Sequence, residues 1–383
     1  MVYSRKISFS LAFVVCLSAI LLSCKKHDEN AFAIKGSIEN LKGNSIIFVR
    51  DYADSVVVDT IKVDKSGDFA FEGTTDTLML GTLYFSNGAS FTSLFVDKAS
   101  AVKVSGDANL PDLIEVKGVD VNDDLTAFKK DNKAILLARA KLLESIRTSS
   151  AQKSQASKLN PDLASKLSNL NYQLTNSASE YIKNNPEKIA SVILLQDFFK
   201  GDDSADQMDR KLQNLRSPAS KFPLAYQLRQ YINQVKASQE GAIAPYFTLK
   251  DTKGNAMRGD QYRGKYLVLS FVSNDCPLCA KNKQELQEIY KKYKSDQLDI
   301  LSIVVKEKAT AKSKSKPGEP SKDSQTVWKV ISLEEGWAAK ILADYNINNL
   351  PVNILINPEG KIIAREESPA LIQPKLPKQI MVQ

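Results

Sequence analysis

Two cysteines late in the chain restrict its possible folds more than any other feature of the sequence. Cys276 and Cys279 enclose only Pro277 and Leu278. The residues before them, 266–272, form an almost continuous apolar run, which predicts a central strand buried on both faces. The residues after them repeat apolar side chains at helical spacing. A cysteine pair of this spacing between a buried strand and a helix is typical of a redox-active site.

The position of the pair favours dithiol chemistry. Pro277 suits the first helical position, so Cys276 would lie at the N-terminus of the helix. Free backbone N–H groups and the helix dipole stabilise a thiolate at that position. Cys279 follows one helical turn later on the same side, close enough to form a disulfide with Cys276. We therefore predict that Cys276 attacks a substrate disulfide and that Cys279 resolves the mixed disulfide.

Composition excludes most other catalytic classes. The 383 residues include one histidine, His27, and four cysteines. Serine–histidine triads and three-histidine zinc sites need more histidines than the chain has. A zinc site also lacks ligands once Cys16 and Cys24 are assigned to the N-terminal segment, so we expect no metal and no organic cofactor. A purely structural disulfide stays an alternative, although a three-residue spacing constrains the unfolded chain little.

The first residues predict a targeting segment. Arg5 and Lys6 precede an apolar run over residues 7–22, which is short for a membrane-spanning helix. The run ends in Leu-Leu-Ser-Cys, which resembles a bacterial lipobox. The resemblance implies a lipoprotein signal peptide at residues 1–23, lipidation of Cys24 and a solvated tether over residues 24–31. An ordinary secretory signal with a chance cysteine is the alternative.

In the middle of the chain the spacing of apolar residues changes from that of β-strands to that of helices. Residues 32–118 alternate short apolar segments with Gly, Asn and Asp, which predicts a small all-β domain. Residues 119–238 predict a helical segment, because apolar residues recur at helical spacing. The clearest stripe consists of Leu163, Leu167, Leu170 and Leu174.

The last third alternates strands and helices. Residues 239–368 predict an α/β domain, interrupted at 306–324 by a polar, lysine-rich insertion, and residues 369–383 form a proline-containing tail. A capping-box pattern at 332–335 predicts a helix that runs to about residue 345.

Four segments of this α/β part resemble the TlpA/ResA group of membrane-tethered thiol–disulfide oxidoreductases. They are an opening strand, the strand before the cysteines, a proline loop and a hairpin turn, at 244–249, 262–271, 350–352 and 357–361. The resemblance implies a thioredoxin-like fold. It also implies that Pro351 is the cis-proline of that group and that Pro351 and Leu350 bind substrate. Asp275 and Ser270 depart from the group, which usually has Trp at the first position and often Asn or Asp at the second.

The β-rich part also resembles a known domain. Residues 59–73 are similar to a β-rich domain of unknown function, DUF4369, that precedes thioredoxin domains in many envelope lipoproteins. The expected architecture is therefore an α/β thioredoxin-like C-terminal domain preceded by a small all-β domain and a helical segment.

These features together predict an envelope thiol–disulfide oxidoreductase that reduces protein disulfides through Cys276 and Cys279. The expected partners are disulfide-containing envelope proteins, a membrane electron-donor thiol protein, and the membrane itself through the lipid anchor. The net charge of +8 is spread without an arginine-rich stripe, so we expect no nucleic-acid partner. The expected location is lipid-anchored in the cell envelope and facing the periplasm, at the outer membrane, with the cell surface as an alternative.

Two other functions stay open. One is a thiol peroxidase of the peroxiredoxin type, which needs Pro and Thr upstream of its cysteine, where only Ser273 comes near the pattern. The other is a non-enzymatic binding lipoprotein whose thioredoxin module is vestigial.

Overall fold

The computed structural model describes residues 29–51, 55–85, 90–151, 161–201, 205–251, 254–293, 296–306 and 326–381. The expected signal peptide, Cys24 and most of the tether lie outside the described residues. The same holds for the expected insertion, apart from Lys306. The chain separates into two compact units, residues 1–167 and 168–383, and each is described by itself.

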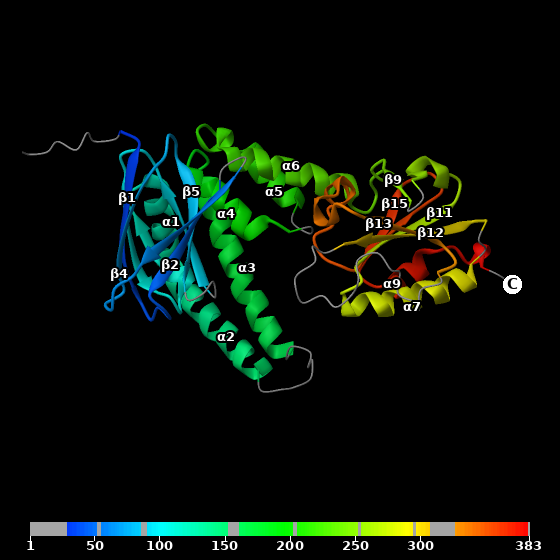
Figure 1. Cartoon of the computed structure of the whole chain (residues 1–383), viewed down its shortest axis with the longest axis horizontal. Helices are drawn as coiled ribbons and strands as arrows, with labels where there is room; N and C mark the ends of the chain where they lie inside the picture. Colours follow the sequence, from blue (N-terminus) through cyan, green and yellow to red (C-terminus); the bar gives the residue numbers. More distant parts are fainter. Residues whose placement is uncertain are drawn as a thin grey trace, which may run out of the picture. The chain divides into compact units, whose positions relative to one another are not determined.

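The first unit begins with two four-stranded sheets (Figure 1). One sheet has the strand order β4-β1-β7-β8 and the other has β3-β2-β5-β6. The strands are β1 (Ala31–Glu39), β2 (Ser45–Asp51), β3 (Val56–Lys62), β4 (Asp68–Thr74), β5 (Met79–Phe85), β6 (Ser90–Val96), β7 (Ala101–Asp107) and β8 (Glu115–Lys117). Alternate side chains of both sheets, such as Ile34, Phe48, Leu83 and Val104, are buried in one core. The alternating apolar segments of the sequence thus form an all-β domain.

A tight turn between β3 and β4 carries the chain from one sheet to the other. The carboxylate of Asp64 accepts hydrogen bonds from the backbone N–H groups of Ser66 and Asp68, both at 2.9 Å. Gly67 has a φ of +88°. A Cβ atom at Gly67 would lie 2.3 Å from the carbonyl oxygen of Ile38, so both the conformation and the space require glycine.

Helix α1 (Asp120–Asp131) contacts the outer strand of each sheet. The amide of Asn122 accepts from the N–H of Phe95 on β6 at 2.8 Å and donates to the carbonyl of Phe95 at 2.7 Å. The hydroxyl of Thr126 accepts from the N–H of Val116 on β8 at 3.0 Å and donates to its carbonyl at 2.7 Å. Two side chains of one helix therefore take the place of a neighbouring strand. Helix α2 (Lys133–Ala151) follows.

A group of helices opens the second unit. Helix α3 (Pro161–Asn184) crosses the boundary between the units, and the helices after it are α4 (Ile189–Phe199), α5 (Ala205–Gln213) and α6 (Pro223–Ser238). Helix α4 is buried on most sides and packs against α5 and α6. Of the leucine stripe on α3, Leu174 is buried and the other three are half-buried. No helix in the described ranges is both long and apolar enough to span a lipid bilayer.

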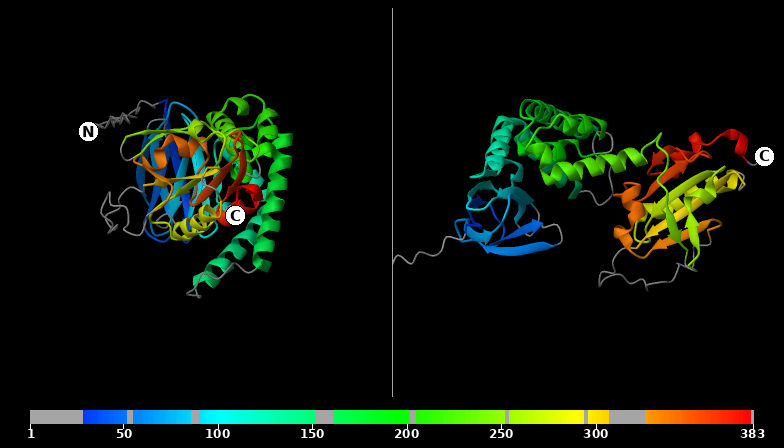
Figure 2. Two further views of the ribbon diagram at one scale, coloured as in Figure 1. Left: turned by 90° about the vertical axis from the view of Figure 1, so that its right-hand side faces the viewer. Right: turned by 90° about the horizontal axis from the view of Figure 1, so that it is seen from above.

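A five-stranded sheet of order β13-β12-β11-β14-β15 forms the rest of the second unit. Figure 2 shows these strands, from different parts of the last third of the chain, side by side in one sheet. Strand β11 pairs in parallel with β12 and antiparallel with β14. The strands of this sheet are β11 (Tyr266–Val272), β12 (Leu298–Val305), β13 (Lys329–Leu333), β14 (Val352–Ile356) and β15 (Ile362–Glu366). Two short strands before it, β9 (Thr248–Lys250) and β10 (Ala256–Arg258), pair with each other in a separate antiparallel sheet. The helices are α7 (Pro277–Lys292), α8 (Lys340–Asp344) and α9 (Pro369–Ile372).

Both faces of this sheet are covered, as the apolar run over 266–272 predicts. Helices α7 and α9 lie on one face, where Val268 and Leu355 join the core beneath them. The side chains of Leu269 and Ile354 point to the other face and pack with residues of α8. The strand order and the position of α7 define a thioredoxin-like fold.

The helix expected from residue 332 to about residue 345 is a wrong prediction. Ser332 and Leu333 end strand β13, where they pair with Val304 and Val305 of β12. Gly336 follows with a φ of +55°, and the α-helix comprises only Lys340–Asp344. The local capping signal was overridden because residues 329–333 complete the edge of a buried sheet.

Candidate active site

The cysteine pair lies where β11 is followed by α7. Cys276 directly precedes the helix in an extended conformation, and Pro277 is the first helical residue. Cys276 and Cys279 form a disulfide, with their Cα atoms 5.3 Å apart. The N–H of Cys279 donates to the carbonyl of Cys276 at 3.1 Å. The first turn of α7 thus holds both sulfurs at the positive end of the helix dipole.

The two sulfurs differ in access. Cys279 is 6% exposed, whereas Cys276 is half-buried and open to solvent on one side. Leu278, between them, is 63% exposed, and Asp275 also faces solvent. Of the two cysteines, Cys276 is therefore the one more accessible to a reaction partner.

A proline loop faces the disulfide from β14. The peptide bond between Leu350 and Pro351 is cis. The carbonyl oxygen of Leu350 lies 3.8 Å from the Sγ atom of Cys276. Pro351 is buried and Leu350 is half-buried. The structure therefore brings the two residues of this loop and the cysteine pair into one site.

An arginine and a tyrosine brace the segment that leads into this loop. The guanidinium of Arg365 on β15 donates to the carbonyls of Tyr345 and Asn346 at 2.8 and 2.7 Å. The hydroxyl of Tyr345 donates to the carbonyl of Pro245 at 2.6 Å. Burial, and to a lesser extent the charge of Asp344, raises the pKa of the Tyr345 hydroxyl far above its usual value. The hydroxyl therefore remains protonated at every physiological pH, and its hydrogen bond to the Pro245 carbonyl is retained.

Three buried polar side chains lie behind the disulfide. Asn282 lies on α7, one turn beyond the second cysteine, and donates to the Ser270 hydroxyl on β11 at 3.0 Å. Asn353 lies on β14, two residues beyond the cis-proline, and its side-chain amide donates to the side-chain oxygen Oδ1 of Asn282 at 2.7 Å. Longer bonds of 3.4 and 3.3 Å join the Asn353 amide to the carbonyls of Glu366 and Glu367. The exposed fractions of Ser270, Asn282 and Asn353 are 0, 3 and 0%. This chain of bonds ties the cysteine helix to the strand that carries the proline.

The chain of bonds also explains one departure from the TlpA/ResA pattern. Ser270 stands where relatives often have Asn or Asp, and here it accepts a bond from a neutral amide. All three members are uncharged, so this chain of bonds holds no buried carboxylate. The Oδ1 atom of Asn353 is buried and accepts no hydrogen bond from the described residues.

Sequence reasoning identified the cysteines and the proline loop but not Asn282 or Asn353. A signal for both was present. Asn282 lies on the buried face of α7 with Cys279, Leu286 and Ile289, and Asn353 interrupts an apolar strand. A polar residue inside an apolar pattern needs a buried partner, so each of these asparagines predicts the other.

Within the described ranges, no three His, Cys, Asp or Glu side chains lie close enough together to be candidate ligands of one metal ion.

Comparisons with known families agree with this geometry. Residues 241–365 match the AhpC/TSA family, and residues 32–125 match the domain of unknown function DUF4369. The second match extends into α1, the helix that contacts both β-sheets. The chain thus has an N-terminal segment that matches DUF4369 and a C-terminal segment, with a thioredoxin-like fold, that matches the AhpC/TSA family.

Individual relatives are similar to the C-terminal domain. The thiol–disulfide oxidoreductase ResA of Bacillus subtilis is 31% identical over 124 residues, which cover 32% of this chain and 65% of ResA. A probable phospholipid hydroperoxide glutathione peroxidase of Nicotiana sylvestris is 46% identical over 57 residues, which cover 15% of this chain and 34% of that protein. The crystal structure of the thioredoxin domain of a Bacteroides vulgatus thiol–disulfide oxidoreductase is 24% identical, with a TM-score of 0.31, and covers 37% of this chain and 98% of that domain.

The fold and the site together define a class. The C-terminal domain is a thioredoxin-like domain with a dithiol–disulfide centre, and it is similar in sequence to ResA-type thiol–disulfide oxidoreductases.

Proposed function

We propose that this chain is an envelope thiol–disulfide oxidoreductase that reduces protein disulfides. The observation that carries the proposal is the disulfide at the start of α7, with Cys276 accessible and Cys279 buried beside the cis-proline loop. The similarity to ResA supports the same activity.

The reaction follows from the order of access of the sulfurs. A thiol donor first supplies two electrons and two protons to the Cys276–Cys279 disulfide. The Cys276 thiolate then attacks a substrate disulfide: a bond forms between Cys276 and one substrate sulfur, and the other substrate sulfur leaves as a thiolate. Cys279 next attacks the Sγ atom of Cys276, which closes the ring disulfide and releases the second substrate thiolate. The substrate gains two electrons and takes up two protons.

The proline loop would hold the substrate during these steps. In this proposal the carbonyl of Leu350 accepts an N–H bond from an extended substrate backbone, which its position next to the Cys276 sulfur supports. Pro351 cannot donate a competing bond, because proline has no backbone N–H.

Residues around the pair favour the reducing direction. Leu278, within the ring, offers neither a charge nor a hydrogen bond to a thiolate. The carboxylate of Asp275 disfavours a neighbouring thiolate by like-charge repulsion. A weakly stabilised thiolate gives a reductant, so we expect a potential of about −200 to −270 mV. A potential above about −150 mV would overturn the reducing direction but not the class of enzyme.

The same proposal includes location and partners. Cys24 would carry the lipid after removal of residues 1–23, which holds the enzyme on the periplasm-facing side of the envelope, at the outer membrane or the cell surface. Its substrates would be disulfide-containing envelope proteins, and a membrane thiol protein would supply its electrons.

A trapping experiment tests the proposal. The Cys279→Ser variant should accumulate mixed disulfides with envelope proteins and lose catalytic insulin reduction, whereas Cys276→Ser should form no mixed disulfides. Absence of insulin reduction by the wild-type chain at any pH would favour the binding-protein alternative. Faster turnover of hydrogen peroxide than of insulin would favour a peroxidase, which the short similarity to the glutathione peroxidase relative makes worth measuring.

A further inference from the structure

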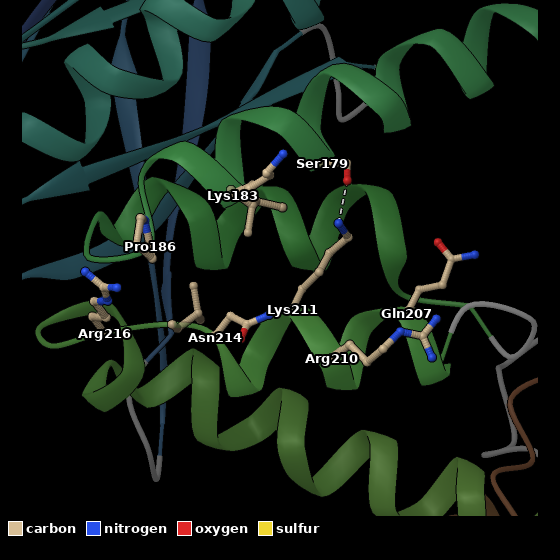
Figure 3. A pocket seen from close by; sticks show the side chains of 10 residues that line it. Ser179, Lys183, Pro186, Gln207, Arg210, Lys211, Asn214 and Arg216 are labelled. Atoms are coloured by element: carbon tan, nitrogen blue, oxygen red, sulfur yellow. Dashed lines mark hydrogen bonds between the residues drawn. The ribbon is translucent and has the colours of Figure 1, made fainter.

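The helical group of the second unit contains a pocket that the proposed redox chemistry does not use. Its volume is about 480 Å³, within the range of small-molecule sites. Four short segments line it: the end of α3, the loop after α3, one side of α5, and the loop after α5. Figure 3 shows these side chains around the opening, with Arg216 at one end and Arg210 with Gln207 at the other.

The charge of this pocket is unbalanced. Four of its ten lining residues are cationic and none is acidic. The cations are Lys183, Arg210, Lys211 and Arg216. The carboxylate of Glu180 lies nearby, and its contact with Lys183 is a 3.9 Å ion pair between exposed groups, which neutralises little of this charge.

Lys211 forms the half-buried centre of the pocket. Its ammonium donates to the Ser179 hydroxyl, drawn as a dashed line in Figure 3, and lies 4.9 Å from the ring centre of Phe199. Burial lowers the pKa of the Lys211 amine, and the charge of Arg210 lowers it further, while Glu180 acts in the opposite sense. The Lys211 ammonium loses water contacts on burial and gains a hydroxyl, a ring and the charge of the exposed Glu180, and the lowered pKa indicates that burial outweighs these gains. An anion in the pocket would offset this cost of burial.

Helix ends alone do not explain this arrangement. Lys183, Arg210 and Lys211 lie in the last turns of α3 and α5, where the helix dipole favours cations. That effect applies equally to fully exposed side chains, so it gives no reason to bury Lys211. It also does not apply to Arg216, which lies beyond the end of α5 on a segment fixed by a bond from its own N–H to the carbonyl of Pro186.

We infer that this pocket binds a small organic or inorganic polyanion, with one acidic group at Arg216 and another at Arg210 and Lys211. The separation of the two cationic ends favours a molecule with at least two acidic groups over a single small anion. Gln207, Asn214 and Ser179 would supply neutral hydrogen bonds, and the buried side chains of Ile182 and Leu215 would contact the apolar part. The site would give the helical segment a binding role independent of the dithiol.

Calorimetric titration of the full chain with citrate, inorganic pyrophosphate and acetate tests this inference at about 150 mM salt. We expect citrate or pyrophosphate to bind with a Kd below about 1 mM and acetate to bind at least tenfold more weakly. Tighter binding of citrate would indicate a polycarboxylate ligand, and tighter binding of pyrophosphate a phosphorylated one. The inference would be overturned if none of the three anions bound at about 10 mM, tenfold above the expected limit of the Kd, or if acetate bound as tightly as citrate and pyrophosphate.

Two variants locate the site. Arg210→Gln and Lys211→Met should each weaken binding about tenfold, the effect of losing roughly 1.4 kcal/mol of interaction. Lys98→Met removes one exposed charge from the first unit and should leave the Kd unchanged. Arg210 is exposed, so its variant tests the site even if Lys211→Met fails to fold. An unchanged Kd in Arg210→Gln would refute the assignment, and insulin reduction should be unaffected by either variant.

Discussion

Replacing Asn282 by alanine tests whether the buried chain of bonds holds the active site together. The variant loses the bond to Ser270 at 3.0 Å and the bond from Asn353 at 2.7 Å. Each buried hydrogen bond contributes about 1 kcal/mol net, and a stranded buried donor costs about 1–3 kcal/mol. The Asn353 amide keeps two longer bonds to backbone carbonyls, and alanine favours the helix by a few tenths of a kcal/mol. We therefore expect the free energy of unfolding of this domain to fall by about 2–3 kcal/mol.

Tryptophan fluorescence makes this measurement selective. The chain has two tryptophans, Trp328 and Trp337, and both belong to the thioredoxin-like domain. Urea unfolding followed by their emission therefore reports this domain and not the β-sheets of the first unit. Gln284→Ala is the matched control, since Gln284 is exposed on the same helix and should change the free energy by less than about 0.5 kcal/mol.

A second variant separates the chain of bonds from simple loss of packing. Asn353→Val and the double variant complete a thermodynamic cycle with Asn282→Ala. If the two amides act as a pair, the cycle should show a coupling energy of about 0.5–3 kcal/mol. A fall of less than about 0.5 kcal/mol in Asn282→Ala, or additive effects in the double variant, would refute the reasoning.

Three further outcomes are expected. Asn122→Ala should speed hydrogen exchange at the Phe95 amide by more than tenfold, because that N–H loses its buried acceptor; unchanged exchange would contradict the contact. Because the folded-state pKa of Lys211 lies below its usual 10.5, the unfolded state binds more protons between the two values, so the free energy of unfolding should rise with pH in that window. Circular dichroism should show this rise in the wild type and not in Lys211→Met. Cys24→Ser should move active protein from the membrane fraction to the soluble fraction, and retention in the membrane would argue against the lipobox.

The sequence predicted those elements whose local pattern agrees with their tertiary environment. The apolar run over 266–272 predicted a buried strand, and the cysteine pair after it predicted the start of α7; the structure has both. Residues 332–335 show the opposite case, because a short-range capping pattern competed with pairing to β12 and lost. The cis geometry of Pro351 came from family resemblance alone, since an X-Pro bond is cis in only about 5–6% of cases.

The site residues that escaped prediction interact across long sequence separations. Asn282 and Asn353 are 71 residues apart, so the sequence around each indicates that it needs a buried partner but not where in the fold the two would meet. The cations of the helical pocket come from α3, α5 and the loop after α5, so no basic run marks them in the sequence. Both groups of side chains are brought together by tertiary packing, and a single sequence gives little information about which faces of its helices and strands pack together.

Helix α1 has a consequence for the solubility of the β domain. An unpaired outer strand offers its N–H and C=O groups to any other extended chain, which makes sheet edges sites of aggregation. Asn122 and Thr126 occupy those groups at one position on β6 and one on β8, so a single helix covers one of the two outer strands of each sheet; β3 and β4 are the other two. A β domain cut off at residue 118 would lose this cover on β6 and β8, and we expect it to self-associate more strongly than one that extends through α1.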